Sequence, residues 1–359
     1  MMTRRRLIQG LAGAAATRLV PSALAQKGAT MVDGSHLPRW RGFNLLEKFT
    51  EQHHSAFSEW DFAHIAQWGF DFVRLPMSYR CWASGHPEHW LELDEASLAQ
   101  VDRAVELGRQ YGVHVNLNLH RAPGYCVNPP PEPLSLWADD RALDACAFHW
   151  GHLAQRYRGI SNQHLTFDLL NEPGMIEEAV YVSVVERLVE AIHEQDPARL
   201  VIADGLAWGR NPVRGLAGLG IAQSTRGYDP MEISHYRASW IGGSDQWPAP
   251  TWPLRRGDGS VCDRDWLRRE RIQPWKDLEA TEVGVHVGEW GAFNRTPHSV
   301  VLAWMKDCLE LWQEAGWGWA LWNFRGSFGL LDSGRDDVAY EDVDGHRLDR
   351  AMLELLRAH

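Results

Sequence analysis

The sequence predicts a single (β/α)8 barrel, the TIM-barrel fold, and three observations support this prediction. Short β-type runs alternate with helical patterns from Arg39 to the C-terminus, and such alternation builds a parallel sheet. Eight of these runs occur in about 320 residues, the size of a barrel with enlarged loops. No Ser-, Thr- or Pro-rich linker divides the stretch, so we expect one domain.

The eight expected strands are Arg41–Leu45, Phe70–Leu75, Val113–His120, Leu165–Leu170, Leu200–Ala203, Met231–His235, Val283–Glu289 and Trp317–Trp322. Segments with apolar residues at helical spacing lie between and after them: Trp60–Trp68, Leu98–Tyr111, Leu143–Tyr157, Ala179–Ile192, Val300–Ala315 and Ala351–Leu356. A doubly wound open sheet is the alternative. It is disfavoured because no G-x-G-x-x-G motif follows the first strand.

Two connections are unusually long. Arg121–Ala138 follows the third expected strand and contains three successive prolines, and Arg237–Arg271 follows the sixth and contains four tryptophans. Both follow a strand, so in a barrel both lie on the face where active sites are built.

The first residues read as an export signal. An arginine pair within Thr3–Gln9 precedes the weakly apolar run Leu7–Ala16, and Ala23-Leu24-Ala25 offers a cleavage site. This pattern resembles a twin-arginine signal covering residues 1–25, with the barrel occupying residues 26–359. The apolar run is too short to anchor the chain in a bilayer, so we expect a periplasmic or extracellular protein without a membrane anchor.

Composition narrows the class of partner. The formal net charge is −11 and no basic stripe is present, which argues against nucleic acid or anionic lipid as a partner. The five cysteines are scattered without metal-ligand spacing, so we expect no metal and no cofactor and predict no disulfide pairing. The 19 tryptophans exceed what a core needs and suggest flat apolar platforms for a ligand.

Polar and aromatic residues collect at the ends of the expected strands, which converge on one pocket in a barrel. They are Arg74, His120, Asn171-Glu172, His235-Tyr236, Glu289 and Trp322. Glu172 and Glu289 end strands four and seven, which lie across the barrel mouth from each other. Two carboxyls in this arrangement suit a retaining glycosidase if they lie about 5–5.5 Å apart, whereas a separation of about 6.5–9.5 Å leaves room for water and gives inversion.

Four motifs in chain order then resemble glycoside hydrolase family 5, the cellulase-like group of retaining β-glycanases. They are Phe72-Val73-Arg74-Leu75-Pro76, Asn116-Leu117-Asn118-Leu119-His120, Leu169-Leu170-Asn171-Glu172-Pro173 and Val287-Gly288-Glu289-Trp290-Gly291. The resemblance extends from Arg39 to Trp322, where a strand-eight tryptophan completes the pattern.

The resemblance implies a role for each matching residue. Glu172 would be the general acid/base and Glu289 the nucleophile. Asn171 would bind the sugar 2-hydroxyl, and Arg74 would keep Glu289 ionised by placing a positive charge beside it. His120 would face the sugar in the −1 subsite, the position of the sugar whose anomeric carbon reacts, and Trp322 would form the floor of that subsite.

The sixth strand departs from the family pattern. Many members place a histidine and a tyrosine two residues apart there, whereas His235 and Tyr236 are adjacent. Both reach one pocket only where the strand has ended or bulges. Four further residues, at strand ends or in strand-end loops, are candidate substrate contacts: Asn44, Trp247, Trp252 and Trp290. The stretch Trp247–Pro253 is the expected wall of an outer subsite.

We therefore expect a secreted, monomeric endo-β-glycanase that acts on a polysaccharide, with β-1,4-glucan as the favoured substrate. Mannan and xyloglucan are alternatives, because specificity within this group lies in loops. Two other classes of function stay open: a metal-dependent barrel hydrolase with His120, His235, Glu172 and Glu289 as ligands, and a barrel that binds glycans without catalysis.

Overall fold

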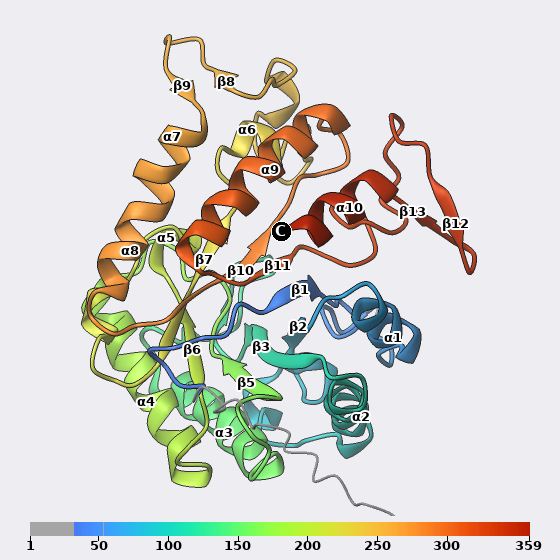
Figure 1. The fold of residues 1–359 in the computed structure, drawn as a ribbon. Coiled ribbons are helices and arrows are strands. Elements are labelled where there is room, and N and C mark those ends of the chain that lie inside the picture. Colours follow the sequence, from blue (N-terminus) through green and yellow to red (C-terminus); the bar gives the residue numbers. More distant parts are fainter. Residues whose placement is uncertain (1–31, 53) are drawn as a thin grey trace, which may run out of the picture. The chain divides into compact units, whose positions relative to one another are not determined.

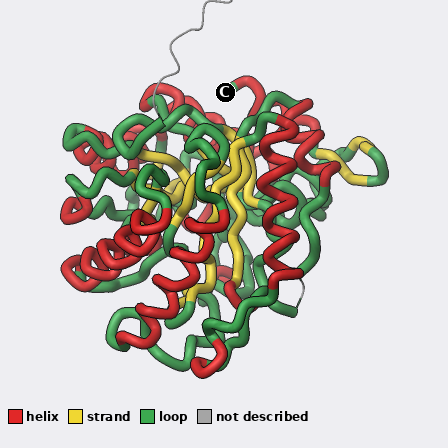
Figure 2. The backbone as a smooth tube through the Cα atoms, turned by 90° about the horizontal axis from the view of Figure 1, so that it is seen from below, coloured by secondary structure: helices red, strands yellow, loops and turns green. Residues whose placement is uncertain are grey.

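The computed structural model describes residues 32–52 and 54–359, and these residues form a closed barrel of eight parallel strands surrounded by helices (Figures 1 and 2). The order around the barrel is β1 (Arg41–Asn44), β2 (Phe72–Ser78), β3 (His114–Ala122), β5 (Leu165–Asp168), β6 (Val201–Asp204), β7 (Ala222–Gly227), β10 (Val285–Trp290) and β11 (Trp319–Leu321). The pairing of β2 with β3 closes the ring. The expected export signal lies outside the described residues.

The barrel strands are buried on both faces, because one face points into the barrel and the other packs under the helices. All seven residues of β2 and all nine of β3 are buried. A small apolar cluster of Trp40, Phe72, Leu200 and Ala320 lies near the start of the strands. The Trp40 ring stacks on His114 at 3.7 Å between centroids. The N-terminal end of the barrel is therefore packed, which leaves the C-terminal end for a site.

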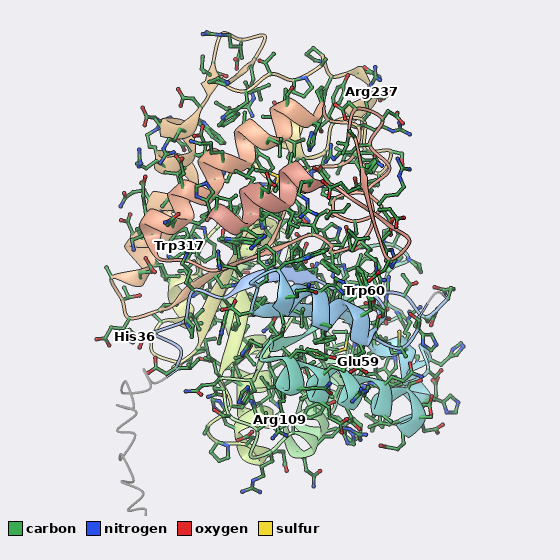
Figure 3. The ribbon with its side chains drawn as sticks, turned by 45° about the vertical axis from the view of Figure 1, so that its right-hand side comes forward. His36, Glu59, Trp60, Arg109, Arg237 and Trp317 are labelled. Atoms are coloured by element: carbon green, nitrogen blue, oxygen red, sulfur yellow. The ribbon has the colours of Figure 1, made fainter. Side chains whose placement is uncertain are left out.

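Helices form the outer layer: α1 (Glu59–Gln67), α2 (Glu95–Tyr111), α3 (Asp140–Arg156), α4 (Glu178–Gln195), α5 (Leu206–Gly209), α6 (Met231–Ser234), α7 (Arg264–Leu267), α8 (Gln273–Glu279), α9 (His298–Ala315) and α10 (Arg350–Ala358). Asp94, Asp139 and Asp349 cap the N-termini of α2, α3 and α10. Glu59 of α1, labelled in Figure 3, accepts hydrogen bonds from Arg103, Gln110 and Tyr111 of α2 and so ties these two helices together.

Seven expected strands and all six expected helices are confirmed, but the expected sixth strand is wrong. Met231–Ser234 forms the single-turn helix α6, and the strand is β7, a few residues earlier. The sequence of β7, Ala-Gln-Ser-Thr-Arg-Gly, lacks the apolar run that marks the other strands. Gln223 exchanges two hydrogen bonds with the Val213 main chain, which satisfies its polar groups inside the protein.

Both connections are long, as expected, but the second begins earlier than predicted, directly after β7, and the end of its predicted range is helical. After β3, the short strand β4 (Tyr125–Cys126) pairs antiparallel with the end of β3. After β7, residues 228–263 contain α6 and the hairpin of β8 (Leu254–Arg255) and β9 (Val261–Cys262). A second hairpin, β12 (Glu341–Val343) with β13 (His346–Leu348), precedes α10. Each of the five cysteines lies in the described part and carries a free thiol. Among the described helices, none has the length and apolar character to cross a membrane.

Trp290 is part of the core, so its expected role as a substrate contact is wrong. It is 0% exposed, and its ring packs against Trp312 and Trp304 of α9 and Trp319 of β11. As the last residue of β10, it points outward because Glu289, its neighbour, points into the barrel.

We expect Trp290→Ala to lower the free energy of unfolding by about 3–5 kcal/mol, because it leaves a large cavity between β10 and α9. Urea titration followed by circular dichroism measures this loss. The half-buried Trp247 provides the control, since Trp247→Ala should change stability by about 1 kcal/mol or less. An unchanged unfolding midpoint for Trp290→Ala would contradict the core assignment.

Candidate active site

The C-terminal ends of the barrel strands bring together two arginines and four largely buried carboxyl groups. Glu289 on β10 lies at the centre, with its side chain 4% exposed. Its Oε1 accepts a hydrogen bond from Arg74 Nη1 at 2.6 Å, and its Oε2 accepts one from the Tyr228 hydroxyl at 3.1 Å. Both carboxylate oxygens are therefore fixed.

Arg74 on β2 connects Glu289 to three other strands. Its Nε donates to Asp168 Oδ2 at 2.7 Å, its Nη1 also donates to Asn44 at 3.1 Å, and its Nη2 donates to Asn171 at 2.9 Å. Four of the five N–H groups of a guanidinium are thus used. Arg74 is held rigidly beside Glu289, as expected from the sequence.

Asn44 supports this arrangement from beneath, so its expected role as a substrate contact is wrong. It is fully buried, and its amide group donates toward the main-chain carbonyls of Gly288, Ala320 and Leu321. Its Oδ1 is occupied by Arg74. These contacts join β1 to β10 and β11 and leave Asn44 no surface for a ligand.

Glu172 follows β5 in an unusual backbone conformation. Its φ is +52°, a region that a residue with a Cβ adopts at a cost of about 1–2 kcal/mol. Two contacts hold it there: its N–H donates to Asp204 Oδ2 at 2.8 Å, and its carbonyl accepts from the Tyr125 hydroxyl at 2.7 Å. Its side chain is 17% exposed at the mouth of the barrel.

Arg226, the second arginine, was not expected from the sequence, and it links Glu172 with Glu289. It lies on β7, where its Nε donates to Glu172 Oε1 at 3.1 Å and its Nη2 approaches Glu289 Oε1 at 3.4 Å. The same guanidinium forms a two-pronged pair with Asp204 and donates to Asn171 at 3.0 Å. One side chain therefore touches both carboxyl groups that the sequence singles out.

The tyrosine of the site is Tyr228, and the expected contribution of Tyr236 is wrong. Arg226 and Tyr228 stand two residues apart at the end of β7 and both contact Glu289. The glycine between them faces outward, where a Cβ would come within 2.7 Å of Trp312. Tyr236 lies beyond α6, is buried, and has its ring 5.2 Å from the Arg237 guanidinium. Arg226 and Tyr228 have the two-residue spacing of the family pattern, which could have identified them. They were not identified because β7 was not recognised as a strand.

His235 lies next to the site rather than at the end of a strand. Its ring meets the Tyr228 ring edge-on at 5.1 Å, and its Nδ1 lies 2.8 Å from Ser234 Oγ. Burial, with the charge of Arg210, lowers its pKa to about 4. His235 is therefore a neutral ring that packs against the Tyr228 ring.

His120 and Trp322 are brought together, as the sequence predicts. The two rings stack at 5.8 Å, and Phe49 contacts both, a third aromatic residue that sequence reasoning missed. His120 Nε2 lies 3.1 Å from Asn128, while its buried Nδ1 has no protein partner. Burial and Arg74 lower the pKa of His120 to about 3, so the ring is neutral. A cavity of about 110 Å³ adjoins His120 and Phe49.

Trp247 and Trp252, in the long connection after β7, were expected to form the wall of an outer subsite, but within the described part of the chain neither forms a hydrogen bond or a ring contact with the residues around Glu172 and Glu289. The Trp252 indole donates to Asp307 on α9, which ties it to the outer helical layer, and Trp247 is half-buried. The exposed tryptophans are Trp208 and Trp240, at 41% and 56%. Trp240 belongs to an aromatic cluster with His235, Phe293 and Phe328.

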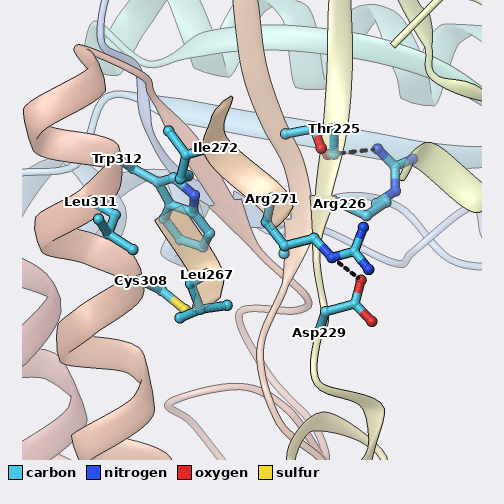
Figure 4. Close-up of a pocket in the computed structure, with 10 residues that line it drawn as sticks. Thr225, Arg226, Asp229, Leu267, Arg271, Ile272, Cys308, Leu311 and Trp312 are labelled. Carbon is cyan, nitrogen blue, oxygen red and sulfur yellow. Dashed lines mark hydrogen bonds and ion pairs between the residues drawn. The ribbon is translucent and has the colours of Figure 1, made fainter. Parts of the chain in front are cut away.

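Behind Arg226 lies a second, much smaller cavity of about 20 Å³ (Figure 4). It is enclosed by β7, the turn before α8 and α9, with Thr225, Asp229, Arg271 and Trp312 among its walls. A space of this size holds about one water molecule and no sugar ring. This cavity is therefore no candidate for a sugar site, and the candidate site is the one that contains Glu172 and Glu289.

Burial and the neighbouring Glu289 raise the pKa of Glu172 to about 8, and the positive charge of Arg226 opposes this rise. Burial and the neighbouring Asp204 raise the pKa of Asp168 to about 7. Among the described residues, no three His, Cys, Asp or Glu side chains are grouped as metal ligands. A protonated carboxyl beside an arginine-bound carboxylate is equipped to donate and accept protons and to attack an electrophilic carbon.

Comparison with known proteins agrees with this geometry. The family model described as "Cellulase (glycosyl hydrolase family 5)" matches residues 33–327. Endoglucanase C of Acetivibrio thermocellus is 24% identical over 336 residues, which cover 87% of this chain and 96% of that protein. A crystal structure of a glycoside hydrolase is 37% identical, with a TM-score of 0.84 over 89% of this chain and 99% of the other. Endoglucanase Cel5A of Thermotoga maritima shares the fold at 21% identity, with a TM-score of 0.72 over 88% and 96% of the two chains.

We expect the Glu172 carboxyl to stay protonated up to about pH 8 and to ionise above it, because its raised pKa favours the neutral form. Carbon-13 NMR of protein labelled at the glutamate carboxyls measures this titration, and Glu172→Gln assigns the signal. A midpoint near the ordinary value of 4.5 would contradict the environment described here.

Proposed function

Since the chain belongs to the cellulase family, glycosyl hydrolase family 5, and is a glycoside hydrolase, we propose that it is an exported endo-β-1,4-glucanase that acts by double displacement. The observation that carries the proposal is the joint binding of Glu172 and Glu289 by Arg226, with Arg74 on Glu289 alone. The two carboxyls lie in one site but in different electrostatic environments. A retaining glycosidase requires this difference.

Glu289 is the nucleophile in this proposal. Hydrogen bonds from Arg74, Arg226 and Tyr228 stabilise its carboxylate and hold it in one orientation. It attacks the anomeric carbon of the sugar and forms a glycosyl ester, while the bond to the leaving oxygen breaks. The Tyr228 hydroxyl donates to Oε2, the carboxylate oxygen that neither arginine contacts.

Glu172 is the general acid and then the general base. Its raised pKa keeps a proton available near neutral pH, and this proton passes to the leaving oxygen as the bond breaks. The resulting carboxylate then removes a proton from water, which attacks the glycosyl ester and releases the sugar with its configuration retained.

Asn171 and His120 present free hydrogen-bonding groups toward the sugar. Both arginines donate to Asn171 Oδ1, so the amide orientation is fixed and its buried Nδ2 has no protein partner. This group is a donor for the sugar 2-hydroxyl. His120 Nδ1 is also without a partner, and the stacked Trp322 ring offers an apolar face to the −1 sugar.

The favoured substrate is a β-1,4-glucan, because the curated relatives matched over most of their length include endoglucanases. Trp208 supports a binding position on the leaving-group side, since its main-chain N–H donates to the carbonyl of Pro173, the residue after Glu172, and its ring is exposed. Mannan and xyloglucan are the alternative substrates. Export through the N-terminal signal and action as a monomer in the periplasm or the medium complete the proposal.

The purified protein should release reducing sugar from carboxymethylcellulose or lichenan, and Glu289→Gln should reduce the rate on the order of 10⁴-fold or more because an amide is a poor nucleophile. Xyloglucan, β-mannan and laminarin complete the panel. Glu186→Gln, on the exposed face of α4, is the matched control and should keep full activity. Inactivity of the wild type on all five polymers would contradict the proposed substrate class.

Glu172→Ala should lose about 10²–10⁴-fold in kcat/KM on cello-oligosaccharides but much less on a 2,4-dinitrophenyl glycoside, whose leaving group needs no proton. Steady-state kinetics on both substrates measure the difference. Equal losses on the two substrates would argue against Glu172 as the acid.

A further inference from the structure

We propose that Asp204 and Arg226 act as a positioning pair that fixes the proton of Glu172 on Oε2, the oxygen that Arg226 leaves free for the leaving group. This inference rests on the proposed function, because it assigns a device for the acid/base step. Its basis is a set of three contacts. The buried carboxylate of Asp204 accepts a hydrogen bond from the Glu172 main chain and another from Arg226, and Arg226 in turn donates to the Glu172 side chain.

The argument begins with Glu172 Oε1. Arg226 Nε donates a hydrogen bond to this oxygen at 3.1 Å. A guanidinium has only donors and stays charged, so a proton on Oε1 would point at another proton. The acid form of Glu172 must therefore carry its proton on Oε2. After that proton is transferred, Oε2 is also the oxygen free to accept one from water, so a single oxygen performs both steps.

The second step concerns the rigidity of Arg226. Asp204 is fully buried and binds both terminal nitrogens of Arg226, while Ser224 Oγ accepts a further bond from Nη1 at 2.9 Å. Gly288 provides the space, because a Cβ there would lie 2.8 Å from Nη1. These contacts hold the guanidinium in one orientation, and its hydrogen bond to Glu172 Oε1 then fixes the orientation of the Glu172 carboxyl.

The third step concerns the main chain. Glu172 keeps its φ of +52° with its N–H bound to Asp204 Oδ2 at 2.8 Å. Asp204 therefore fixes the acid residue at two points, the backbone directly and the carboxyl through Arg226. A lysine at position 226 would keep the charge but could not reproduce the planar two-pronged contact.

The charges around Glu172 give the pair a second, separable effect. Arg226 on β7 and Arg74 on β2 face it with positive charge, Asp204 on β6 and Glu289 on β10 face it with negative charge, and the neutral hydroxyls of Tyr125 and Tyr228 lie nearby. Arg226 stabilises the ionised form of Glu172. Removing that charge should extend the protonated form, and hence activity, to higher pH.

The test compares kcat/KM on cello-oligosaccharides and on a 2,4-dinitrophenyl glycoside, with full pH profiles, for Arg226→Lys, Arg226→Gln and Asp204→Asn. We expect Asp204→Asn to lose about 10²-fold or more on the oligosaccharide and less than about 10-fold on the activated substrate. Arg226→Lys, which also changes a contact with Glu289, should lose activity on both substrates but more on the oligosaccharide. In Arg226→Gln the alkaline limb of the profile should also move to higher pH. Arg199→Lys, a buried arginine paired with Asp196 away from the site, controls for the loss of a buried ion pair and should show neither effect.

Equal losses on both substrates by folded variants, or an alkaline limb that stays in place in Arg226→Gln, would overturn the inference. Circular dichroism checks folding, and Asp204→Asn decides the matter if the arginine variants do not fold, since it keeps the side-chain shape. Failure of the proposed function is distinguishable, because the wild type itself would then cleave neither substrate.

Discussion

The ion cluster at the barrel mouth is the constraint on which the rest of the site depends. Two guanidiniums, Arg74 and Arg226, face the four carboxyls of Asp168, Asp204, Glu172 and Glu289. If all four carboxyls were ionised, two negative charges would lack compensation where little water reaches them, so at least one proton must stay. Glu289 contacts both arginines and a tyrosine hydroxyl, whereas Glu172 contacts only one arginine. Asp168 likewise contacts only one arginine, so Glu172 and Asp168 are the two carboxyls that the charge balance favours to keep a proton.

Such a cluster is a poor source of stability, because burying charges costs about as much free energy as their attraction returns. The stability comes instead from the apolar packing of the barrel. Its strands are buried on both faces, and the tryptophans of β10, β11 and α9 pack around the outer side of the strand that carries Glu289. A rigid core at that position holds a strained backbone and several desolvated charges in one geometry, which is the general condition for a preorganised site.

The sequence predicted this fold well wherever strands and helices follow an apolar period, and it failed where a strand is polar. The β7 strand was missed because its inward residues are polar: Arg226 belongs to the ion cluster and Ser224 accepts a hydrogen bond from it. The adjacent apolar Met231 and Ile233 then suggested a strand that is in fact a helical turn. Arg74, Glu172 and Glu289 were found because each follows an apolar run. Asn44 and Trp290 were misassigned because a strand end gives no indication of which way its last side chain points.

The replacement of the expected histidine by Arg226 is consistent with Asp204 beneath it. A neutral imidazole offers one N–H group and would leave the carboxylate of Asp204 buried with an unbalanced charge. Arg226 neutralises that charge at any working pH and still has an Nε–H to direct at Glu172. Asp204 and Arg226 therefore depend on each other, because replacing either one alone would leave the other as a buried charge without a partner. Tyr228 occupies the expected position two residues on, so the contact with Glu289 is kept while the neighbouring position carries a fixed charge instead of a titrating ring.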